Sequence, residues 1–190
     1  MSTKVTVNQS KSVRVLGLIT AIVGVVLFVA GGVAYGMVGS FLKSENITVA
    51  GDAAFLAGKP VAGPFTAFAQ ADIINTHALG GADGMTYAEL GDVQTEAKNK
   101  LQELTDAGMA EGDAEFDAAQ AQLEKVTGQR NLVMNGSFLR ASLFTSVVSF
   151  GVSVLVMGVG VLFAIVGYAI IKISGGPAVV TETTTPSAGA

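Results

Sequence analysis

Two long stretches without an ionisable side chain constrain this sequence more than any other feature. They cover residues 15–42 and 141–171, which are 28 and 31 residues long, and neither contains Asp, Glu, Lys, Arg or His. The hydrocarbon core of a bilayer is roughly 30 Å thick, so a spanning helix needs about 20 apolar residues. In a soluble protein, helices of this composition would have no polar face for water. We therefore expect transmembrane helices at 13–42 and 141–172.

The first stretch follows the basic residues Lys4, Lys11 and Arg14, an arrangement also typical of a secretory signal peptide. The apolar part of a signal peptide is only about 7–15 residues long. No convincing small-x-small cleavage motif precedes "AYGMVGSFLKSEN". We therefore expect an uncleaved anchor.

The charge distribution suggests an orientation for the two spans. Residues 43–140 contain 14 of the 15 acidic and 7 of the 11 basic residues, whereas the arm 1–12 contains no acidic residue. Orientation follows Lys and Arg near the ends of the spans, and by that count the two sides are nearly equal. The basic N-terminus ahead of the first span therefore decides the orientation that we expect. We expect the arm and a disordered tail, 173–190, in the cytoplasm, and 43–140 outside the plasma membrane.

Glycines recur in both expected spans, mostly seven residues apart. Helices associate in lipid by packing, and small residues let two backbones approach closely. The simpler interpretation is that the two spans pack on each other as an antiparallel hairpin. The alternative is that a glycine face binds the helix of a partner protein or of a second copy. The candidate packing residues are Gly17, Gly24, Gly31, Gly32, Gly36, Gly151, Gly158, Gly160 and Gly167.

The segment between the spans is expected to be a helical domain, which makes the chain an all-α membrane protein. Pro64 and Gly80 have the positions of a first helical residue and of the residue just past a helix end, and so predict a helix over 64–79. Thr86 and Glu89 have the spacing of a capping box, which predicts the start of another helix. The preceding "NITVA", residues 46–50, is a weak strand signal.

Residues 93–126 are polar and predict a helical hairpin with its turn at "DAGMAEGD", residues 106–113. One apolar stripe passes through Leu101 and Leu104 on the first arm, and a looser one passes through Phe116 and Leu123 on the second. The later "NGS", residues 135–137, is expected to cap a separate helix that forms the second span.

His77 is the only histidine and the chain has no cysteine, which limits the chemistry it can perform. If 64–79 is helical, Asp72 lies about 140° round the helix from His77 and cannot pair with it. Zinc and non-haem iron sites take two or three His or Cys ligands. We therefore expect His77 to cap or pack the helix end, and we expect no catalytic set, metal or cofactor.

Three other functional classes are also disfavoured. The acidic residues around the hairpin turn lack the ligand order of an EF-hand and are expected to be solvated. The spans carry none of the charges that mark ion pathways, which argues against an ion-coupled transporter. Because the exposed segment is acidic, we expect no nucleic-acid binding.

At "FLAGKPVAGPFTAFAQADIINTHALGG", "TYAEL" and "NGSFLRASLFTSVVSFGV" the sequence resembles a family of small actinobacterial membrane proteins with two spans and an external loop. The resemblance covers both spans and both ends of the loop, and the segment 92–130 is longer here. Many members carry the name aromatic ring-opening dioxygenase. That name implies ferrous iron held by two histidines and a carboxylate, and one histidine provides no such set to carry over.

These observations predict a non-enzymatic integral membrane protein, an accessory or interaction subunit of a cell-envelope or respiratory assembly. Its partners would be the bilayer and either another protein or a second copy of the chain. Three alternatives stay open: a dioxygenase with ligands from another subunit, a component of an oligomeric channel or transporter, and an envelope lipid- or glycan-binding protein with a pocket near "PFTAF". The candidate contact residues are Phe65, Phe68, His77, Tyr87, Leu101, Leu104, Phe116 and Leu123.

Overall fold

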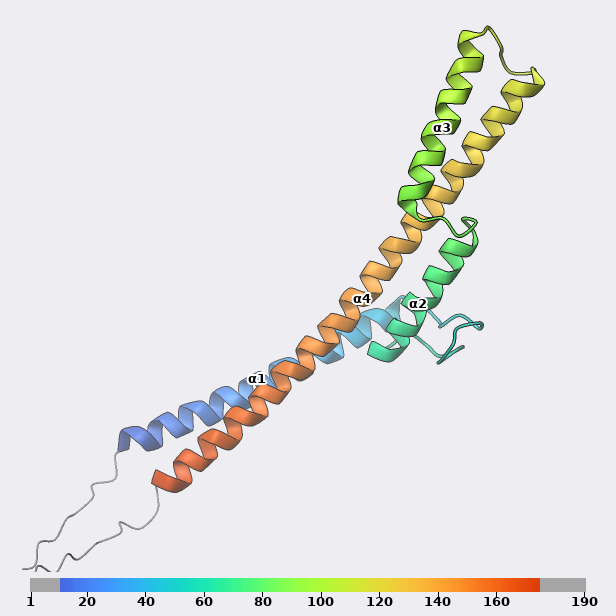
Figure 1. Cartoon of the computed structure of the whole chain (residues 1–190). Coiled ribbons are helices and arrows are strands. Elements are labelled where there is room, and N and C mark those ends of the chain that lie inside the picture. The colour runs from blue at the N-terminus through green and yellow to red at the C-terminus, as the bar shows by residue number, and fades with distance from the viewer. Residues whose placement is uncertain (1–10, 175–190) are drawn as a thin grey trace, which may run out of the picture. The chain divides into compact units, whose positions relative to one another are not determined.

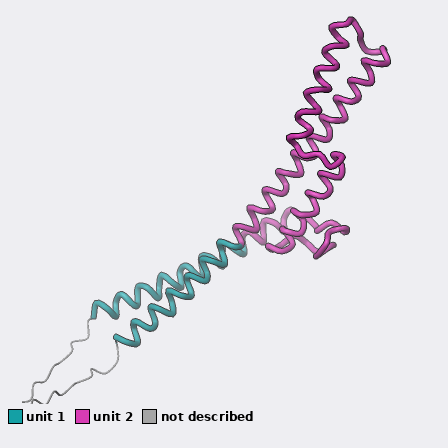
Figure 2. The backbone as a smooth tube through the Cα atoms, viewed as in Figure 1, with its two compact units in different colours: residues 1–36, 151–190 teal, residues 37–150 magenta. Residues whose placement is uncertain are grey.

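A computed structural model describes residues 11–174, and over this range the chain is helical, with no strand (Figure 1). Its four helices are α1 (Lys11–Ser44), α2 (Pro64–Gly80), α3 (Tyr87–Asp106) and α4 (Ala114–Ser174). The chain forms two compact units, which we describe separately (Figure 2). The first consists of the described residues up to Gly36 and from Gly151 onward, and the second is Met37–Phe150. Most of the expected arm and tail lies outside the described residues.

Two helices, α1 and α4, are long and apolar enough to cross a membrane. Over the first unit their large apolar side chains, such as Leu16, Val26 and Leu155, are mostly exposed. Side chains of this kind would face lipid favourably, whereas in water they would form a large apolar surface. Two helices with these properties indicate a membrane location.

The buried residues of the first unit are all small. On α1 they are Gly17, Gly24 and Gly31, and on α4 they are Ser153, Gly160 and Gly167. Both series repeat every seven residues. Gly17 lies against Gly167, Gly24 against Gly160 and Gly31 against Ser153, so the contacts follow opposite orders along the two helices.

The second unit has a core in two parts, both packed on α4. In the first part, Leu42 at the end of α1 and Ala67 and Ala71 of α2 pack with Leu143 and Phe150. In the second part, four residues around the start of α3 and the facing turn of α4 are buried: Ala82, Leu90, Val126 and Val133. Figure 1 shows α2 and α3 lying one after the other along α4.

Two expectations drawn from local signals are confirmed. α2 begins at Pro64, with the Thr66 hydroxyl accepting the Gly63 amide at 3.2 Å, and it ends at Gly80. The end differs slightly, because Gly80 belongs to the last turn and Gly81 follows it with an ordinary right-handed φ of −75°. At the start of α3 the capping box is present: the Glu89 carboxylate accepts the Thr86 amide at 2.7 Å.

Two other expectations are wrong. Residues 46–50 make only an isolated bridge, in which the Val49 amide donates to the Lys59 carbonyl oxygen and Thr48 faces Pro60. The expected cap at 135–137 is absent, since α4 passes through it as one helix of 61 residues. No proline stands at these positions to break the helix, and Gly136 lies against Ala78 of α2, so α4 continues through them.

Candidate functional site

The second unit contains an open cleft of about 530 Å³. The end of α1, the loop after it, α2 and α4 form its walls. The apolar part of the lining consists of Val38, Phe41, Leu42, Ile47, Ile74, Leu139 and Leu143, and the polar part of Glu45, Gln70, Ser142, Thr145, Ser146 and Ser149. α2 begins with "PFTAF", so the cleft lies on the helix that starts with this motif.

The polar groups of the cleft are mostly acceptors or are already bonded to the backbone. The hydroxyls of Thr145 and Ser149 donate to carbonyl oxygens one turn earlier in α4, each at 2.8 Å. The Gln70 side-chain oxygen accepts the Ala50 amide at 3.0 Å. Glu45 supplies the only formal charge of the lining, and no Lys, Arg or His contributes to it. This lining suits an apolar chain with a neutral or positively charged head, and it does not suit an anion.

His77 forms its contact with Asp52. Its Nε2 lies 2.7 Å from Asp52 Oδ2, and both side chains are at least half exposed. The hydrogen bond from His77 lowers the pKa of Asp52. The pair joins the loop after α1 to the last turn of α2, whereas Asp72 is exposed and takes no part. The contact spans 25 residues of chain, so helix geometry around His77 could not reveal it.

A polar network joins α3 to α4 at the base of the hairpin. Arg130 Nη1 donates to Gln94 Oε1 at 2.7 Å, and Gln94 Nε2 donates to Thr127 Oγ1 at 2.8 Å. The Arg130 guanidinium also lies 4.3 Å from the centre of the Tyr87 ring. Gln94 is buried, so these bonds satisfy an amide that would be costly to leave unpaired.

A second polar contact fixes the turn before α3. Asp83 accepts hydrogen bonds from Gln129 at 2.8 Å and from Lys125 at 3.2 Å, and these two partners lower its pKa. Asp83 has a φ of 55°, in the left-handed region that Asp and Asn tolerate better than most residues. Both networks hold the hairpin together by joining α3 and the turn before it to α4.

The candidate contact residues separate into two groups. Leu104 is buried, and Leu101, Phe116 and Leu123 are partly buried, so these four serve the packing of the hairpin. The other four are exposed: Phe65, Phe68, His77 and Tyr87. Of the exposed group, His77 and Tyr87 already have the partners described above.

The candidate glycines also separate. Gly17, Gly24, Gly31, Gly160 and Gly167 lie in the buried series of the first unit. A side chain at Gly36, Gly151 or Gly158 would meet nothing within 4 Å, and one at Gly32 would meet only Met157 Sδ at 3.9 Å. Ser153, which is not a glycine, takes the first position of the series on α4.

Among residues 11–174, no group of three or more His, Cys, Asp or Glu is placed to hold a metal ion. The acidic residues of the hairpin turn act as local caps instead. Asp113 accepts the Ala110 amide at 2.9 Å, and Asp117 accepts the Gly112 amide at 3.1 Å. These bonds close the turn and start α4.

No protein-family model, curated protein or solved structure matches this chain. Over residues 11–174 the chain is an all-helical protein with two helices long and apolar enough to cross a membrane.

Proposed function

We propose that the chain is a non-enzymatic, two-span protein of the plasma membrane, whose domain 43–140 binds a partner outside the cell. In this proposal α1 and the second half of α4 form an antiparallel transmembrane hairpin, and both termini are cytoplasmic. The protein acts as an accessory subunit of a cell-envelope or respiratory assembly. The resemblance to two-span actinobacterial proteins agrees with this architecture.

One observation carries the proposal: α4 is a single helix from Ala114 to Ser174. Its polar first part packs with α3, and its charge-free part, 141–171, is long enough to span a bilayer. The helix that forms the outer hairpin therefore continues as the span without a loop.

The orientation can be tested cleanly because the chain has no cysteine. Asn99→Cys on the exposed surface of α3 and Ser187→Cys in the tail each introduce a single thiol. We expect a membrane-impermeant maleimide to label the first variant in intact cells and the second only after lysis. Labelling of both variants, or only of Ser187→Cys, in intact cells would contradict the orientation.

The partner can be tested by purifying the tagged full chain from its native membrane in mild detergent. We expect stoichiometric foreign subunits, identified by mass spectrometry. A photo-crosslinking residue at Asn99 is expected to attach to one of them, whereas a protein that elutes alone as a homo-oligomer would contradict the proposal. Metal analysis of the same eluate tests the dioxygenase alternative, because iron in stoichiometric amount would overturn the non-enzymatic assignment.

The cleft favours envelope-lipid binding as a second candidate function. A volume of about 530 Å³ and a mainly apolar lining suit one lipid chain, with Glu45 and Gln70 available to a neutral or amine-bearing head. Native mass spectrometry of the detergent-purified chain should then show one retained lipid. Ser142→Trp, which places a large ring in the cleft, should lower that occupancy, and unchanged occupancy would exclude the cleft as the site.

A further inference from the structure

The second unit exposes an apolar patch on the loop after α1 and on the first turns of α2. Four large side chains form it: Phe55 is 41% exposed, Leu56 38%, Phe65 76% and Phe68 44%. The rings of Phe55 and Phe68 are 6.1 Å apart, and Phe65 lies one turn before Phe68 on α2. Apolar groups of this size gathered on one surface indicate an interaction site.

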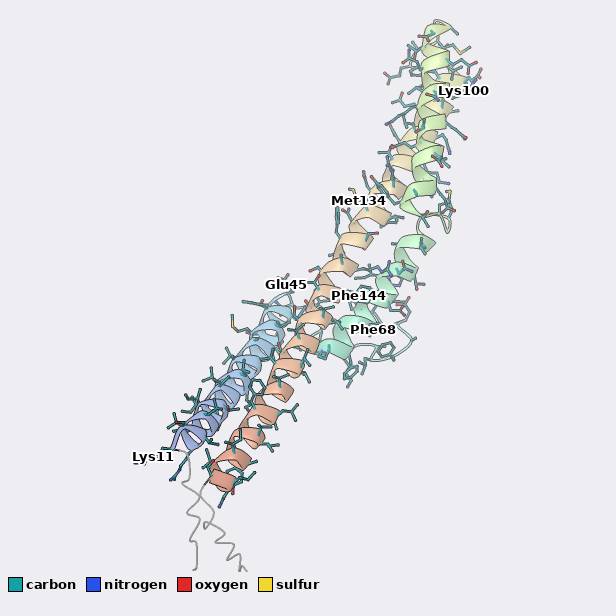
Figure 3. All side chains as sticks on the ribbon, turned by 60° about the vertical axis from the view of Figure 1, so that its left-hand side comes forward. Lys11, Glu45, Phe68, Lys100, Met134 and Phe144 are labelled. Atoms are coloured by element: carbon teal, nitrogen blue, oxygen red, sulfur yellow. The ribbon has the colours of Figure 1, made fainter. Side chains whose placement is uncertain are left out.

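The patch is joined to the beginning of the charge-free part of α4. The Phe68 ring packs edge-on against the Phe144 ring with centroids 5.8 Å apart, and Figure 3 shows these two side chains next to each other. Phe144 is the fourth residue of the run 141–171. Arg140, the last charged residue before that run, has its guanidinium 5.9 Å from the centre of the same ring. The helix rises about 1.5 Å per residue, so Phe144 lies roughly 6 Å beyond Arg140 along α4.

The backbone holds the patch in place. Leu56 has a φ of 56°, a left-handed conformation that is costly for a bulky residue and persists only where the surroundings impose it. The Asp52–His77 contact holds the loop against α2, and the Val49 amide bonds to Lys59 across the loop. The four side chains are therefore presented together on a fixed loop and helix end.

We propose that Phe55, Leu56, Phe65 and Phe68 insert into the boundary between headgroups and acyl chains of the leaflet that α4 enters at Arg140. This inference rests on the proposed two-span architecture. Phe and Leu side chains on elements lying in the membrane surface bury about 5–10 Å into that boundary. We assign the bilayer as the occupant because Phe68 of the patch packs on Phe144, close to the point where the charged residues of α4 end. The Arg140 guanidinium beside Phe144 would then lie at the level of the lipid headgroups. Through this contact the domain gains a second attachment to the membrane besides its spans.

The absence of tryptophan from the chain allows a direct test. Phe65→Trp, Phe163→Trp and Phe116→Trp each introduce a single tryptophan, at the patch, within the charge-free part of α4 and on the hairpin respectively. Each full-length variant is placed in nanodiscs of phosphatidylcholine brominated either near the headgroup or near the chain end. Phe55→Trp serves as a second patch probe on the loop.

We expect Phe65→Trp and Phe55→Trp to lose more fluorescence to the shallow bromines than to the deep ones. Phe116→Trp should lose no fluorescence to either kind of bromine. Phe163→Trp should lose fluorescence, because this residue lies within the proposed span. Quenching at Phe163 with none at Phe65 and Phe55 would overturn the inference and leave the two-span architecture standing. If the tryptophans of Phe65→Trp and Phe55→Trp are shielded from water only in native membranes that contain other proteins, and not in nanodiscs, the inference is overturned in favour of a protein partner. A failure of quenching at Phe163 would contradict the proposed architecture itself.

Discussion

Gly24 of α1 and Gly160 of α4 lie so close together that neither position has room for a side chain. A Cβ atom on Gly24 would lie 2.5 Å from the Gly160 carbonyl oxygen, and a Cβ atom on Gly160 would lie 2.6 Å from the Gly24 carbonyl oxygen. Both obstacles are backbone atoms, which cannot rotate away as a flexible side chain can. The contact between these two helices therefore depends on the absence of a methyl group at both positions.

The first prediction is that Gly24→Ala weakens the association of α1 with α4. The helices must separate to admit the methyl group, and overpacking of this kind costs about 1–3 kcal/mol. Steric trapping of the full chain in bicelles measures this free energy, with one biotin near the start of α1 and one near the end of α4, beyond the contact of Gly17 with Gly167. Gly32→Ala is the matched control, because its Cβ would meet only Met157 Sδ at 3.9 Å. Equal losses for the two variants would show that the helices pack through another face.

The second prediction concerns α2, which approaches α4 closely at one glycine. A Cβ atom on Gly136 would lie 2.7 Å from the Cβ atom of Ala78, which has no further side-chain torsion to relieve the contact. We expect Gly136→Ala to loosen α2 and to speed the hydrogen exchange of its amides, measured by mass spectrometry in nanodiscs. Gly128→Ala, on the same helix but facing open space, should instead stabilise α4 by roughly 0.5–1 kcal/mol. Faster exchange of α2 in both variants would contradict the close approach.

The elements with local signals could be predicted from the sequence. Pro64 fixes the start of α2, Thr86 with Glu89 fixes the start of α3, and two charge-free runs mark the candidate spans. Each signal acts within about one helical turn or along one apolar stretch. None of them requires knowledge of which helix lies beside which.

The contacts between distant segments could not be predicted in this way. Asp52 reaches His77 because the loop folds back on α2, and no spacing rule covers such a contact. In α4, Gly151 and Gly158 have the same interval as Gly160 and Gly167, but only the second pair belongs to the buried series. Which series faces the neighbouring helix depends on the rotation of α4 about its own axis. Spacing alone does not contain that information.

The third prediction is that Asp83 stabilises the hairpin in a pH-dependent way. Its pKa is lowered by Gln129 and Lys125, so folding favours the ionised form. The stabilisation is therefore complete above the ordinary carboxyl pKa of about 3.9 and is lost as the pH falls through the lower pKa of the folded state. Asp83→Asn removes the charge while keeping a residue that tolerates the φ of 55°.

We expect Asp83→Asn to lower the melting temperature of the detergent-solubilised chain at pH 7, and the difference from the natural chain to shrink at acid pH. Circular dichroism at several pH values measures both effects. Asp72→Asn is the control, because Asp72 is exposed and has no partner among the described residues. A difference that stays constant from pH 7 to acid pH would show that the charge of Asp83 is not the cause.

The fourth prediction is an energetic coupling between Tyr87 and Arg130, which join α3 to α4. The guanidinium lies 4.3 Å from the ring centre, and the tyrosine is exposed, so the coupling should be about 0.5–1 kcal/mol. A double-mutant cycle with Tyr87→Leu and Arg130→Met isolates it, since the loss of the Arg130–Gln94 hydrogen bond occurs on both sides of the cycle and cancels. The free energy of opening of α3, from hydrogen exchange of its amides in nanodiscs, provides the four values. The parallel cycle of Tyr87→Leu with Lys100→Met should show no coupling, because Lys100 pairs with Glu103 and Glu115 near the hairpin turn. Additive effects in the first cycle would mean that Arg130 holds the hairpin through Gln94 alone.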